Sequence, residues 1–538
     1  MVNIKIEPNK FWKFHKSTKS NLWIKGYLYS HTIEELLLEL DNSEANNLES
    51  LISSLNGHFA IVFQNKNFTL AIVDRVRSIP IQFTEISGDF FISDRSNTLK
   101  NLAGFDSKRN KEALLEIEMS GFVIGSNCVY ESIKSLTAGQ FVLFKNNKSF
   151  KVNTYYSYFG EISKSNYDSL LKELEVTTIS IFKKLLKNIG DREILVPLSA
   201  GFDSRLVVSI LKHLGANNVK CYSYGQRNNF EAITAKKIAD KLGYKWTFVE
   251  LSHKTEKSFY NSNFFKKYTQ EYDSGTAVAY FQSLSTISYL KRINFINDNT
   301  VIINGNGGDF ISGAHINSLF EKLKNINITS DAELMSIITE KLLDKHFSLW
   351  GLLKTDKNLS VIKNNIIESL RNRCFGLNKS NAHLFYEYSE LIDRQSKYVI
   401  VGQRVFEFHG NEWRMPLWDD EYLFFWQKIP SQLKSNQKLY KEMLLKNNFG
   451  GVWDESIPIN KKNIRPLWII PLRFISKIPF LLFGKKAWKN FDKVFFYYWR
   501  DATLMICYAN YFRIIKDYFK YPRNHVSWQA DDYVKKHS

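Results

Sequence analysis

The chain has 538 residues, more than one hydrophobic core usually holds, so we expect two or three domains. Hydrophobic residues make up 44% of the chain and charged residues 24%, which is typical of soluble globular proteins. No apolar run reaches about 18 residues and the N-terminus lacks an apolar signal-peptide core, which argues against a membrane span and an export signal. We therefore expect a cytoplasmic protein.

The net charge of +19 is unevenly distributed. Residues 461–538 contain 16 lysines and arginines against 5 aspartates and glutamates, so this aromatic segment alone carries +11. Two interpretations stay open: a helical subdomain with solvated basic faces, or a surface for polyanions or for anionic lipid at the inner face of a membrane. Nucleic-acid binding would depend on net charge alone, so we expect no nucleic-acid partner.

The four cysteines, Cys128, Cys221, Cys374 and Cys507, lie far apart in the sequence. They form no CxxC pair and no Cys/His spacing of the kind that binds zinc. The sequence therefore predicts neither a disulfide framework nor a zinc site.

Residues 1–160 are predicted to be rich in β-strands. The stretch "HFAIVFQNKNFTLAIVDR" predicts two strands joined by a turn at residues 65–67, and "GDFFISD" and "GQFVLFKNNKSF" continue the pattern. Residues 163–166 are polar and indicate a linker.

From Glu193 the pattern changes to alternating strands and helices. "EILVPL", "VKCYSYG" and "KWTFVEL" predict strands, separated by helices that end near Gly215 and Gly243. This alternation predicts a parallel sheet with right-handed crossovers. "TVIINGNGGD" predicts a further strand with a glycine-rich turn, and residues 317–460 predict a mostly helical region.

The stretch "LSAGFDS" lies between the first of these strands and its helix. A helix N-terminus offers backbone N–H groups and a partial positive charge, and the small residues Ser199, Ala200 and Gly201 would let a phosphate approach. An aspartate would repel phosphate unless a cation lay between them, so Asp203 indicates Mg²⁺. The loop matches neither the GxxxxGK[ST] nor the GxSxG pattern, so a Walker-type loop and a hydrolase serine are not predicted.

The second turn, "INGNGGDFISG", has three glycines in five residues and ends at Asp309. Ligands bind at the carboxyl ends of parallel strands, where both turns would meet. One such turn alone would predict a capped helix or a tight loop, but two turns that each carry an aspartate favour a binding site.

At these residues the sequence resembles the asparagine synthetase family. "LSAGFDS" is similar to the pyrophosphate-binding loop SGGxDS and "NGNGGD" to the motif SGxGxD, and a third block starts at "EWRMPLWDDEYLFFW". "NGHFAIVFQNKNFTLAIVDRVRSIPIQF", "FFISDRSNTLKNL" and "IKSLTAGQFVLF" resemble blocks of the family's glutaminase-like domain. The resemblance covers about residues 20 to 450.

The resemblance implies an α/β fold in three parts. Residues 1–160 would form an Ntn-hydrolase-like α+β domain, a degenerate glutamine amidotransferase. Residues 170–460 would form a parallel-sheet PP-loop ATP pyrophosphatase domain with helical additions, and residues 461–538 a mostly helical basic tail.

The implied chemistry is ATP-dependent amide formation through an acyl-adenylate, with release of AMP and pyrophosphate. The nucleotide and its pyrophosphate end would be held by Leu198, Ser199, Gly201, Asp203, Ser204, Tyr224, Asn304 and Gly305. Mg²⁺ would be held by Asp203 and Asp309. The family lysine that contacts the reacting phosphate corresponds best to Lys441, with Lys438 as its rival.

The N-terminal domain departs from the glutamine-dependent members. These begin with Met-Cys, and their cysteine releases ammonia from glutamine, whereas this chain begins Met-Val-Asn and has Lys25-Gly26 in place of the expected Asn-Gly. We therefore expect no glutaminase activity. The amine would be free ammonia, ammonia from a partner protein, or an amine on the substrate itself.

The ligase motifs depart from asparagine-making members at Asn306 and Phe310, where acidic residues usually stand. The pattern resembles asparagine-synthase-like proteins of bacterial surface-polysaccharide clusters, which implies a sugar acid as the carboxylate substrate. Two alternatives stay open: ammonia-dependent asparagine synthesis from aspartate, and a catalytically inactive scaffold.

Overall fold

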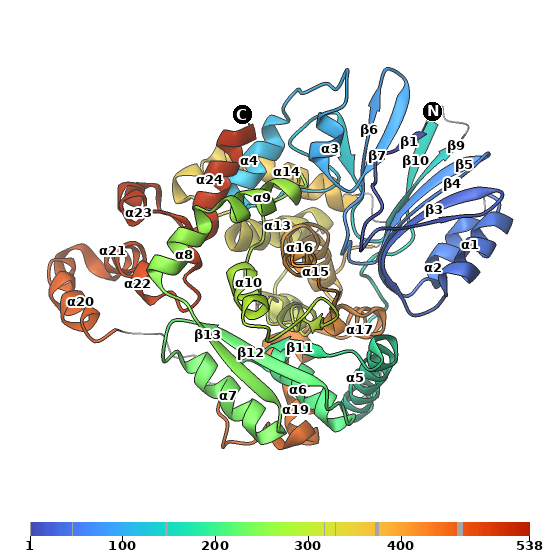
Figure 1. The fold of residues 1–538 in the computed structure, drawn as a ribbon. Coiled ribbons are helices and arrows are strands. Elements are labelled where there is room, and N and C mark those ends of the chain that lie inside the picture. The colour runs from blue at the N-terminus through green and yellow to red at the C-terminus, as the bar shows by residue number, and fades with distance from the viewer. Residues whose placement is uncertain are drawn as a thin grey trace.

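The computed structural model describes residues 2–45, 47–145, 149–316, 318–328, 330–371, 376–459 and 466–537. Figure 1 shows the N-terminal strands in one half of the molecule and a separate sheet with long helices in the other. The last part of the chain runs back along the molecule, so that both termini lie at the top of this view.

A six-stranded antiparallel sheet dominates the N-terminal domain, in the order β10-β9-β5-β4-β3-β2. Alternate residues of β4 explain its continuous burial: Phe59, Ile61 and Phe63 pack with helices α1 and α2, while Ala60 and Val62 face the central core. The bounds are α1 (Ile33–Asn42), α2 (Leu48–Ser54), β2 (Lys13–Lys16), β3 (Ser20–Leu28), β4 (Gly57–Asn65), β5 (Phe68–Val73), β9 (Gln140–Lys145) and β10 (Ser149–Thr154).

A second sheet of the same domain has the order β1-β7-β6-β8, with β1 parallel to β7. The predicted turn between β4 and β5 is present, because the Asn65 side chain accepts hydrogen bonds from the backbone N–H groups of Asn67 and Phe68. The bounds are β1 (Val2–Ile4), β6 (Gln82–Ile86), β7 (Asp89–Ser93), β8 (Ile133–Ser135), α3 (Ser96–Lys100) and α4 (Lys111–Ser120).

The second half of the chain is built on a five-stranded sheet, β13-β12-β11-β14-β15, in which every pair is parallel. The predicted strand–helix alternation is therefore confirmed. The C-cap residue of α7 is Gly243, in the left-handed conformation, and that of α6 is Leu214, with Gly215 directly after it. The bounds are α5 (Tyr167–Ile189), β11 (Ile194–Pro197), α6 (Phe202–His213), β12 (Val219–Gly225), α7 (Phe230–Leu242), β13 (Lys245–Glu250), β14 (Val301–Ile303) and β15 (Trp413–Arg414).

Helices surround this sheet and connect it with the N-terminal domain. Before β14 lie α8 (His253–Tyr260), α9 (Asn263–Glu271) and α10 (Leu284–Arg292), and after it α11 (Gly308–Ile311), α12 (Leu319–Lys322), α13 (Asp331–His346) and α14 (Asp356–Arg371). Then follow α15 (Ala382–Glu390), the π-helix η3 (Leu391–Val399), η4 (Ile400–Gln403), α16 (Arg404–Phe408), α17 (Asp420–Trp426), α18 (Ser431–Lys434) and α19 (Lys438–Asn447).

A buried ion pair in η3 joins the two domains. The Lys397 ammonium group donates to the carbonyls of Val123 and Gly125 at 2.6 Å each and to the Asp393 carboxylate at 2.8 Å. The same carboxylate accepts the backbone N–H of Gly125 at 2.8 Å. The loop after α4 is therefore fixed against the helices of the second domain.

The tail is helical and runs over both domains. Its elements are α20 (Ile469–Lys477), α21 (Phe480–Phe495), α22 (Tyr497–Arg500), η8 (Met505–Tyr508), α23 (Tyr511–Lys516), η9 (Tyr518–Lys520) and α24 (His525–His537). Helix α24 packs on α4 of the N-terminal domain, whereas α20 and α21 project from the molecule (Figure 1). The predicted boundary between the ligase domain and the tail, at residues 460 and 461, lies outside the described residues.

Across the described residues, no helix has the length and apolar character that a membrane crossing requires. Cys128, Cys221 and Cys507 are buried free thiols, and Cys374 lies outside the described residues.

Replacing Lys397 with methionine should destabilise the protein, because the change leaves the buried Asp393 carboxylate without its cation. We expect a loss of about 3–5 kcal/mol in the unfolding transition that involves the domain junction. The urea midpoint of Lys397→Met, followed by tryptophan fluorescence, measures this loss. Lys172→Met is the matched control, because Lys172 forms an exposed pair with Glu175 and should change stability by less than about 1 kcal/mol. Equal shifts in both variants would contradict the prediction.

Candidate functional site

The first predicted turn connects β11 to α6 at the carboxyl edge of the parallel sheet. Gly201 is the N-cap residue of α6, and no side chain caps this end of the helix. A 12-residue helix with an uncapped N-terminus presents its partial positive charge to whatever lies in front of it. The turn thus has the anion-binding character that the sequence predicts.

Two hydroxyl groups shape this turn. The Ser204 hydroxyl accepts the backbone N–H of Ser199 at 3.0 Å and lies 3.0 Å from the Ser199 hydroxyl. The Ser199 hydroxyl in turn accepts the N–H of Gly201 at 3.2 Å. Both hydroxyls can rotate, so each can turn a proton toward an anion that replaces one of these contacts.

The second turn, after β14, lies directly against the first. The backbone N–H of Asp309 donates to the Asp203 carboxylate at 2.9 Å. A Cβ atom at Gly308 would lie 2.2 Å from the same carboxylate, and one at Gly305 would lie 3.0 Å from the Asp203 backbone. Glycine is therefore required for the contact between the turns, and the two predicted aspartates are brought together.

A cavity of about 670 Å³ opens at this junction. All the residues predicted to hold the nucleotide, its pyrophosphate or Mg²⁺ line it: Leu198, Ser199, Gly201, Asp203, Ser204, Tyr224, Asn304, Gly305 and Asp309. A volume of this size is typical of small-molecule and cofactor sites.

A buried tyrosine holds one of the aspartates. The Tyr440 hydroxyl donates to Asp203 at 3.3 Å, and burial followed by the charge of Asp203 raises the pKa of Tyr440 well above its usual value. The hydroxyl therefore stays protonated at neutral pH. On the other side, the Gln437 amide donates to Asp309 at 3.3 Å and to the Ser312 hydroxyl at 2.8 Å.

The cavity continues past the residues predicted to hold the nucleotide, to a wall that no sequence pattern indicates. The π-helix η3 contributes Arg394, Gln395 and Tyr398 to this wall, and His315 lies beside them. In a π-helix the residues facing one side differ from those of an α-helix, so the 3.6-residue periodicity could not indicate them. Arg394 brings a positive charge into the same cavity as the two aspartates.

A chain of polar contacts lines the wall near β12. The Gln282 amide donates to the Tyr224 hydroxyl at 2.6 Å, and the Tyr280 hydroxyl donates to Gln282 at 2.5 Å. Neither Tyr280 nor Gln282 lies in a motif, so no sequence pattern indicates them.

The tail closes one side of the cavity. Ala502 and Thr503 line it, and the Ala502 carbonyl accepts the backbone N–H of Gln226 at 2.9 Å. Gly225 permits this contact, because a Cβ there would lie 2.4 Å from the Ala502 oxygen. The segment predicted as a separate tail therefore contributes to the site.

The predicted lysine does not line the cavity. The Lys441 ammonium group donates to the Asn436 carbonyl at 2.7 Å and lies 5.4 Å from the ring centre of Phe202, the first residue of α6. Lys438 points instead to Tyr167 of α5, with 5.4 Å between its ammonium group and the ring centre. Of the two, Lys441 is thus the one beside the anion-binding turn.

A separate cavity of about 330 Å³ lies at Lys25 and Gly26, where the family resemblance placed the Asn-Gly motif. Lys25 lines it and forms a buried ion pair with Glu407 of α16, at 2.7 Å. Gly26 has φ +99°, and a Cβ there would lie 2.1 Å from the His58 carbonyl. In place of the expected asparagine, Lys25 therefore holds the two domains together.

None of the described cysteines is placed for nucleophilic chemistry. Cys128, Cys221 and Cys507 are buried, and burial raises the pKa of Cys128 and of Cys507 to about 12 and that of Cys221 still further. These thiols stay protonated at neutral pH, whereas the thiolate is the nucleophile.

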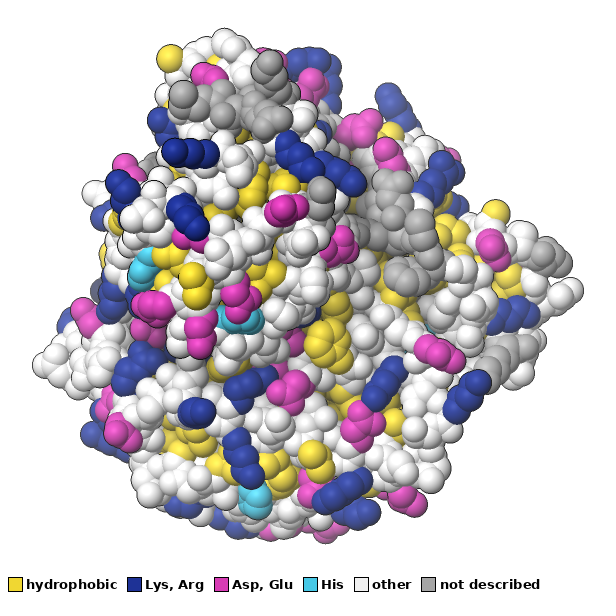
Figure 2. All heavy atoms as spheres, turned by 90° about the vertical axis from the view of Figure 1, so that its right-hand side faces the viewer, with side chains coloured by type: hydrophobic (Ala, Val, Ile, Leu, Met, Phe, Trp, Pro, Cys, Tyr) yellow, Lys and Arg dark blue, Asp and Glu magenta, His cyan; other side chains and the backbone are white. Residues whose placement is uncertain are grey.

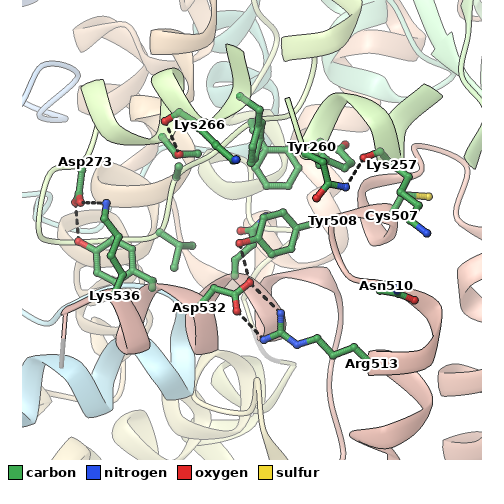
Figure 3. A pocket seen from close by; sticks show the side chains of 18 of the residues that line it. Lys257, Tyr260, Lys266, Asp273, Cys507, Tyr508, Asn510, Arg513, Asp532 and Lys536 are labelled. Atoms are coloured by element: carbon green, nitrogen blue, oxygen red, sulfur yellow. Dashed lines mark hydrogen bonds and ion pairs between the residues drawn. The ribbon is translucent and has the colours of Figure 1, made fainter. Parts of the chain in front are cut away.

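A further cavity of about 490 Å³ lies between α8, α9 and the tail (Figure 3). Its acidic groups are paired: Asp532 with Arg513 at 2.7 Å, and Asp273 with Lys536 at 3.2 Å. None of the predicted site residues lines this cavity. Phe281 faces it while its neighbours Tyr280 and Gln282 face the first cavity, so the two share a wall.

The face drawn in Figure 2 shows lysines and arginines interspersed with aspartates and glutamates. This face, which carries α1 and α5, is therefore not a continuous basic surface.

Gly308→Ala should weaken ATP binding at least about tenfold, because the new methyl group would push the second turn away from Asp203. Isothermal titration with ATP measures the effect. Gly88→Ala is the control: its Cβ meets nothing within 4 Å, and the strain of its positive φ affects stability alone. Equal ATP affinity in the Gly308 variant and the wild type would show that the contact does not matter.

Comparison with known proteins agrees with this architecture. The family model for asparagine synthase matches residues 186–461, more than half of the chain, and that for a glutamine amidotransferase domain matches residues 15–156. No curated protein matches the chain.

Three solved structures are similar to parts of the chain at low identity. The NH3-dependent NAD synthetase from Campylobacter jejuni is 12% identical over 40% of this chain and 99% of its own, with a TM-score of 0.21. The glutamine phosphoribosylpyrophosphate amidotransferase from B. subtilis is 11% identical over 45% and 73%, with a TM-score of 0.18. The glutamine-dependent NAD+ synthetase from Acinetobacter baumannii is 12% identical over 65% and 78%, with a TM-score of 0.19. These values carry no argument about activity.

The two family matches coincide with the two sheet systems, and the fold class predicted from the sequence is confirmed. The chain belongs to the asparagine synthase family, as a carbon–nitrogen ligase with ATP-dependent amidation chemistry and an N-terminal glutamine-amidotransferase domain.

Proposed function

We propose that the protein activates a carboxylate with ATP and converts it to an amide without using glutamine. The observation that carries the proposal is one cavity in which the N-terminus of α6, two aspartates and Arg394 all meet. A triphosphate needs the first two features, and a carboxylate substrate needs a cation such as Arg394.

The reaction has two steps. A carboxylate oxygen attacks the α-phosphorus of ATP, the bond from that phosphorus to the bridging oxygen breaks, and pyrophosphate leaves with the electron pair. The amine nitrogen then attacks the acyl carbon of the adenylate, the acyl C–O bond breaks, and AMP leaves. The nitrogen loses one proton as the amide forms.

Different residues of the cavity would bind the nucleoside part and the phosphates of ATP. Leu198, Tyr224, Asn304 and Gly305 would hold the nucleoside part. The turn from Ser199 to Ser204 would hold the phosphates, with two hydroxyls and the helix N-terminus as donors.

Asp203 and Asp309 fit a magnesium ion that is shared with the phosphates. Among the described residues no group of three or more acidic, histidine or cysteine side chains could hold a metal alone. Mg²⁺ in nucleotide sites is commonly bound by one or two carboxylates together with phosphate oxygens, so two aspartates suffice. Bound there, Mg²⁺ would screen the negative charge of the leaving pyrophosphate.

The acceptor end of the cavity favours a carboxylate other than aspartate. Asn306 and Phe310 line the cavity without charge, and Phe310 stacks on Trp418 with 5.3 Å between ring centres. The amino group of aspartate would find no acidic partner at these two positions. A sugar acid, which presents hydroxyls to Gln395, Tyr398 and His315 and its carboxylate to Arg394, suits this wall. We propose a role in surface-polysaccharide synthesis because sugar acids are the substrate class that suits this wall.

The first experiment measures pyrophosphate and AMP release from Mg-ATP and an ammonium salt with a panel of carboxylates. The panel contains aspartate, nucleotide-linked uronic acids and a no-substrate control. Release with a uronic acid supports the proposal, and release with aspartate supports the alternative, ammonia-dependent asparagine synthesis. No release together with no ATP binding would support a catalytically inactive scaffold.

Asp203→Asn and Asp309→Asn should each reduce pyrophosphate release by about 100-fold or more, because each removes a charge that would hold Mg²⁺. Removal of Mg²⁺ with EDTA should stop the wild-type reaction, and added Mg²⁺ should restore it. Asp240→Asn, on the exposed side of α7, is the control and should keep full activity. Full turnover by the Asp203 variant would remove the Mg²⁺ assignment.

Lys441→Ala should slow pyrophosphate release by about 10- to 100-fold, with little change in ATP affinity, if its side chain swings from Asn436 to the developing charge. Lys438→Ala, one turn away and directed to α5, is the matched control. Equal rates in the Lys441 variant and the wild type would show that another residue contacts the reacting phosphate. Lys461 and Lys462, which follow the cavity residue Ile459 in the chain, would then be the next candidates.

Glutamine should not replace the ammonium salt, because Lys25 is committed to Glu407 and the described thiols are buried and protonated. Glutamate release from glutamine, measured beside amide formation, tests this expectation. Glutamate released at the rate of turnover would show an active glutaminase. Turnover with ammonium but not with glutamine would mean that the amide nitrogen comes from free ammonia or from a partner protein.

A further inference from the structure

The helices α20 and α21 expose an unusual number of apolar side chains. Ten large apolar residues between residues 467 and 483 are between 47% and 90% exposed, out of 25 such residues in the whole described part of the chain. The ten are Leu467, Trp468, Ile470, Leu472, Phe474, Ile475, Ile478, Leu481, Leu482 and Phe483. Single exposed apolar residues are ordinary, but a contiguous group of this size marks an interaction site.

These side chains are exposed although the segment itself is anchored. On its inner side Phe491 packs on Phe480, Phe495 and Tyr518, and Trp468 contacts Trp499. At Gly484, with φ +84° and ψ +169°, the helical path breaks, so that Leu481–Phe483 form a tip. We call residues 466–495 the α20–α21 hairpin, and Figure 1 shows it projecting from the body beside α22.

The charge of the hairpin is almost all positive. It contains six lysines and arginines and a single acidic residue, Asp492, which is paired with Arg473 and Arg500. Lys477, Lys485, Lys486 and Lys489 are exposed, and no described carboxylate forms an ion pair with them. Exposed apolar side chains thus lie beside exposed ammonium groups.

We propose that the α20–α21 hairpin docks the protein on an anionic phospholipid bilayer, with its apolar tip in the acyl boundary and its lysines at the headgroups. An amphipathic element that binds in the interface plane combines an apolar face with a lysine-rich polar face. Helix α20 has 9 residues, about 14 Å in length, which suits insertion to roughly 5–10 Å and is too short to span.

A second copy of the chain fits this surface less well. Pairing two hairpins would bring two groups of unpaired lysines together, and like charges across an interface oppose binding. Anionic lipid supplies the complementary charge for all of them at once.

The remainder of the tail has a different role. Ala502 and Thr503 lie at the cavity wall and α24 packs on α4, so neither is available to a membrane. Only nine residues separate the start of this wall, Ala502, from Asp492 of the hairpin, and docking would therefore hold the cavity close to the bilayer surface.

The test measures binding of the full-length protein to vesicles of phosphatidylglycerol and phosphatidylcholine by flotation. The triple variant Leu481→Ser, Leu482→Ser, Phe483→Ser should bind at least tenfold more weakly, and Lys485→Glu, Lys486→Glu should lose the dependence on anionic lipid. The matched control is Leu38→Ser, Leu352→Ser, because these exposed leucines lie in other parts of the chain. Adenylation of a soluble carboxylate should be unchanged in all variants, since none of these residues lines the cavity.

Equal vesicle binding by the triple variant and the wild type would overturn the proposal, as would binding that ignores lipid charge. Sedimentation without vesicles tests whether a second copy of the chain binds the hairpin instead of lipid. A wild-type dimer that the triple variant loses, together with no vesicle binding, would assign the hairpin to self-association. Vesicle binding by an enzyme without amidation activity would still support the docking role, so the two proposals can fail separately.

Discussion

The structure depends on the contact between two turns at the carboxyl edge of the parallel sheet. Asp203 accepts a hydrogen bond from the backbone of Asp309, and a Cβ atom at Gly308 would lie 2.2 Å from the Asp203 carboxylate. This contact brings two carboxylates to the N-terminus of α6, where the helix dipole favours anions. Carboxylates beside an anion-binding turn need a cation, and this requirement makes the arrangement suited to Mg²⁺ and a triphosphate.

Two further elements complete the cavity around this contact. The π-helix η3 turns Arg394 and Tyr398 into the cavity, while Lys397 of the same helix holds the N-terminal domain through the carbonyls of Val123 and Gly125. The tail adds Ala502 and Thr503 on another side. The domain junction and the site therefore share a structural element.

The N-terminal domain is held together by the alternating burial of its strands. Its sheets keep the alternating burial that packs α1 and α2 on one face, because packing depends on apolar residues at every second position. The position of the expected asparagine is occupied by Lys25, whose pairing with Glu407 makes the pocket part of the domain interface. A buried ion pair of this kind is costly to break, so Lys25 stabilises the domain interface.

The strand–helix alternation, the turn at residues 65–67 and the two aspartate-bearing turns could be predicted from the chain alone, because these depend on local periodicity and on glycine at particular positions. The sequence also indicated residues of the two turns that line the cavity, such as Ser199, Asp203, Asn304 and Asp309, since those residues lie within short motifs. The folded structure was needed to show that Arg394 and Gln282 line the cavity, that Lys441 lies beside it, and that the tail divides into a wall segment and an exposed hairpin. These features depend on which surfaces distant segments cover, and burial between segments hundreds of residues apart leaves no local pattern in the chain.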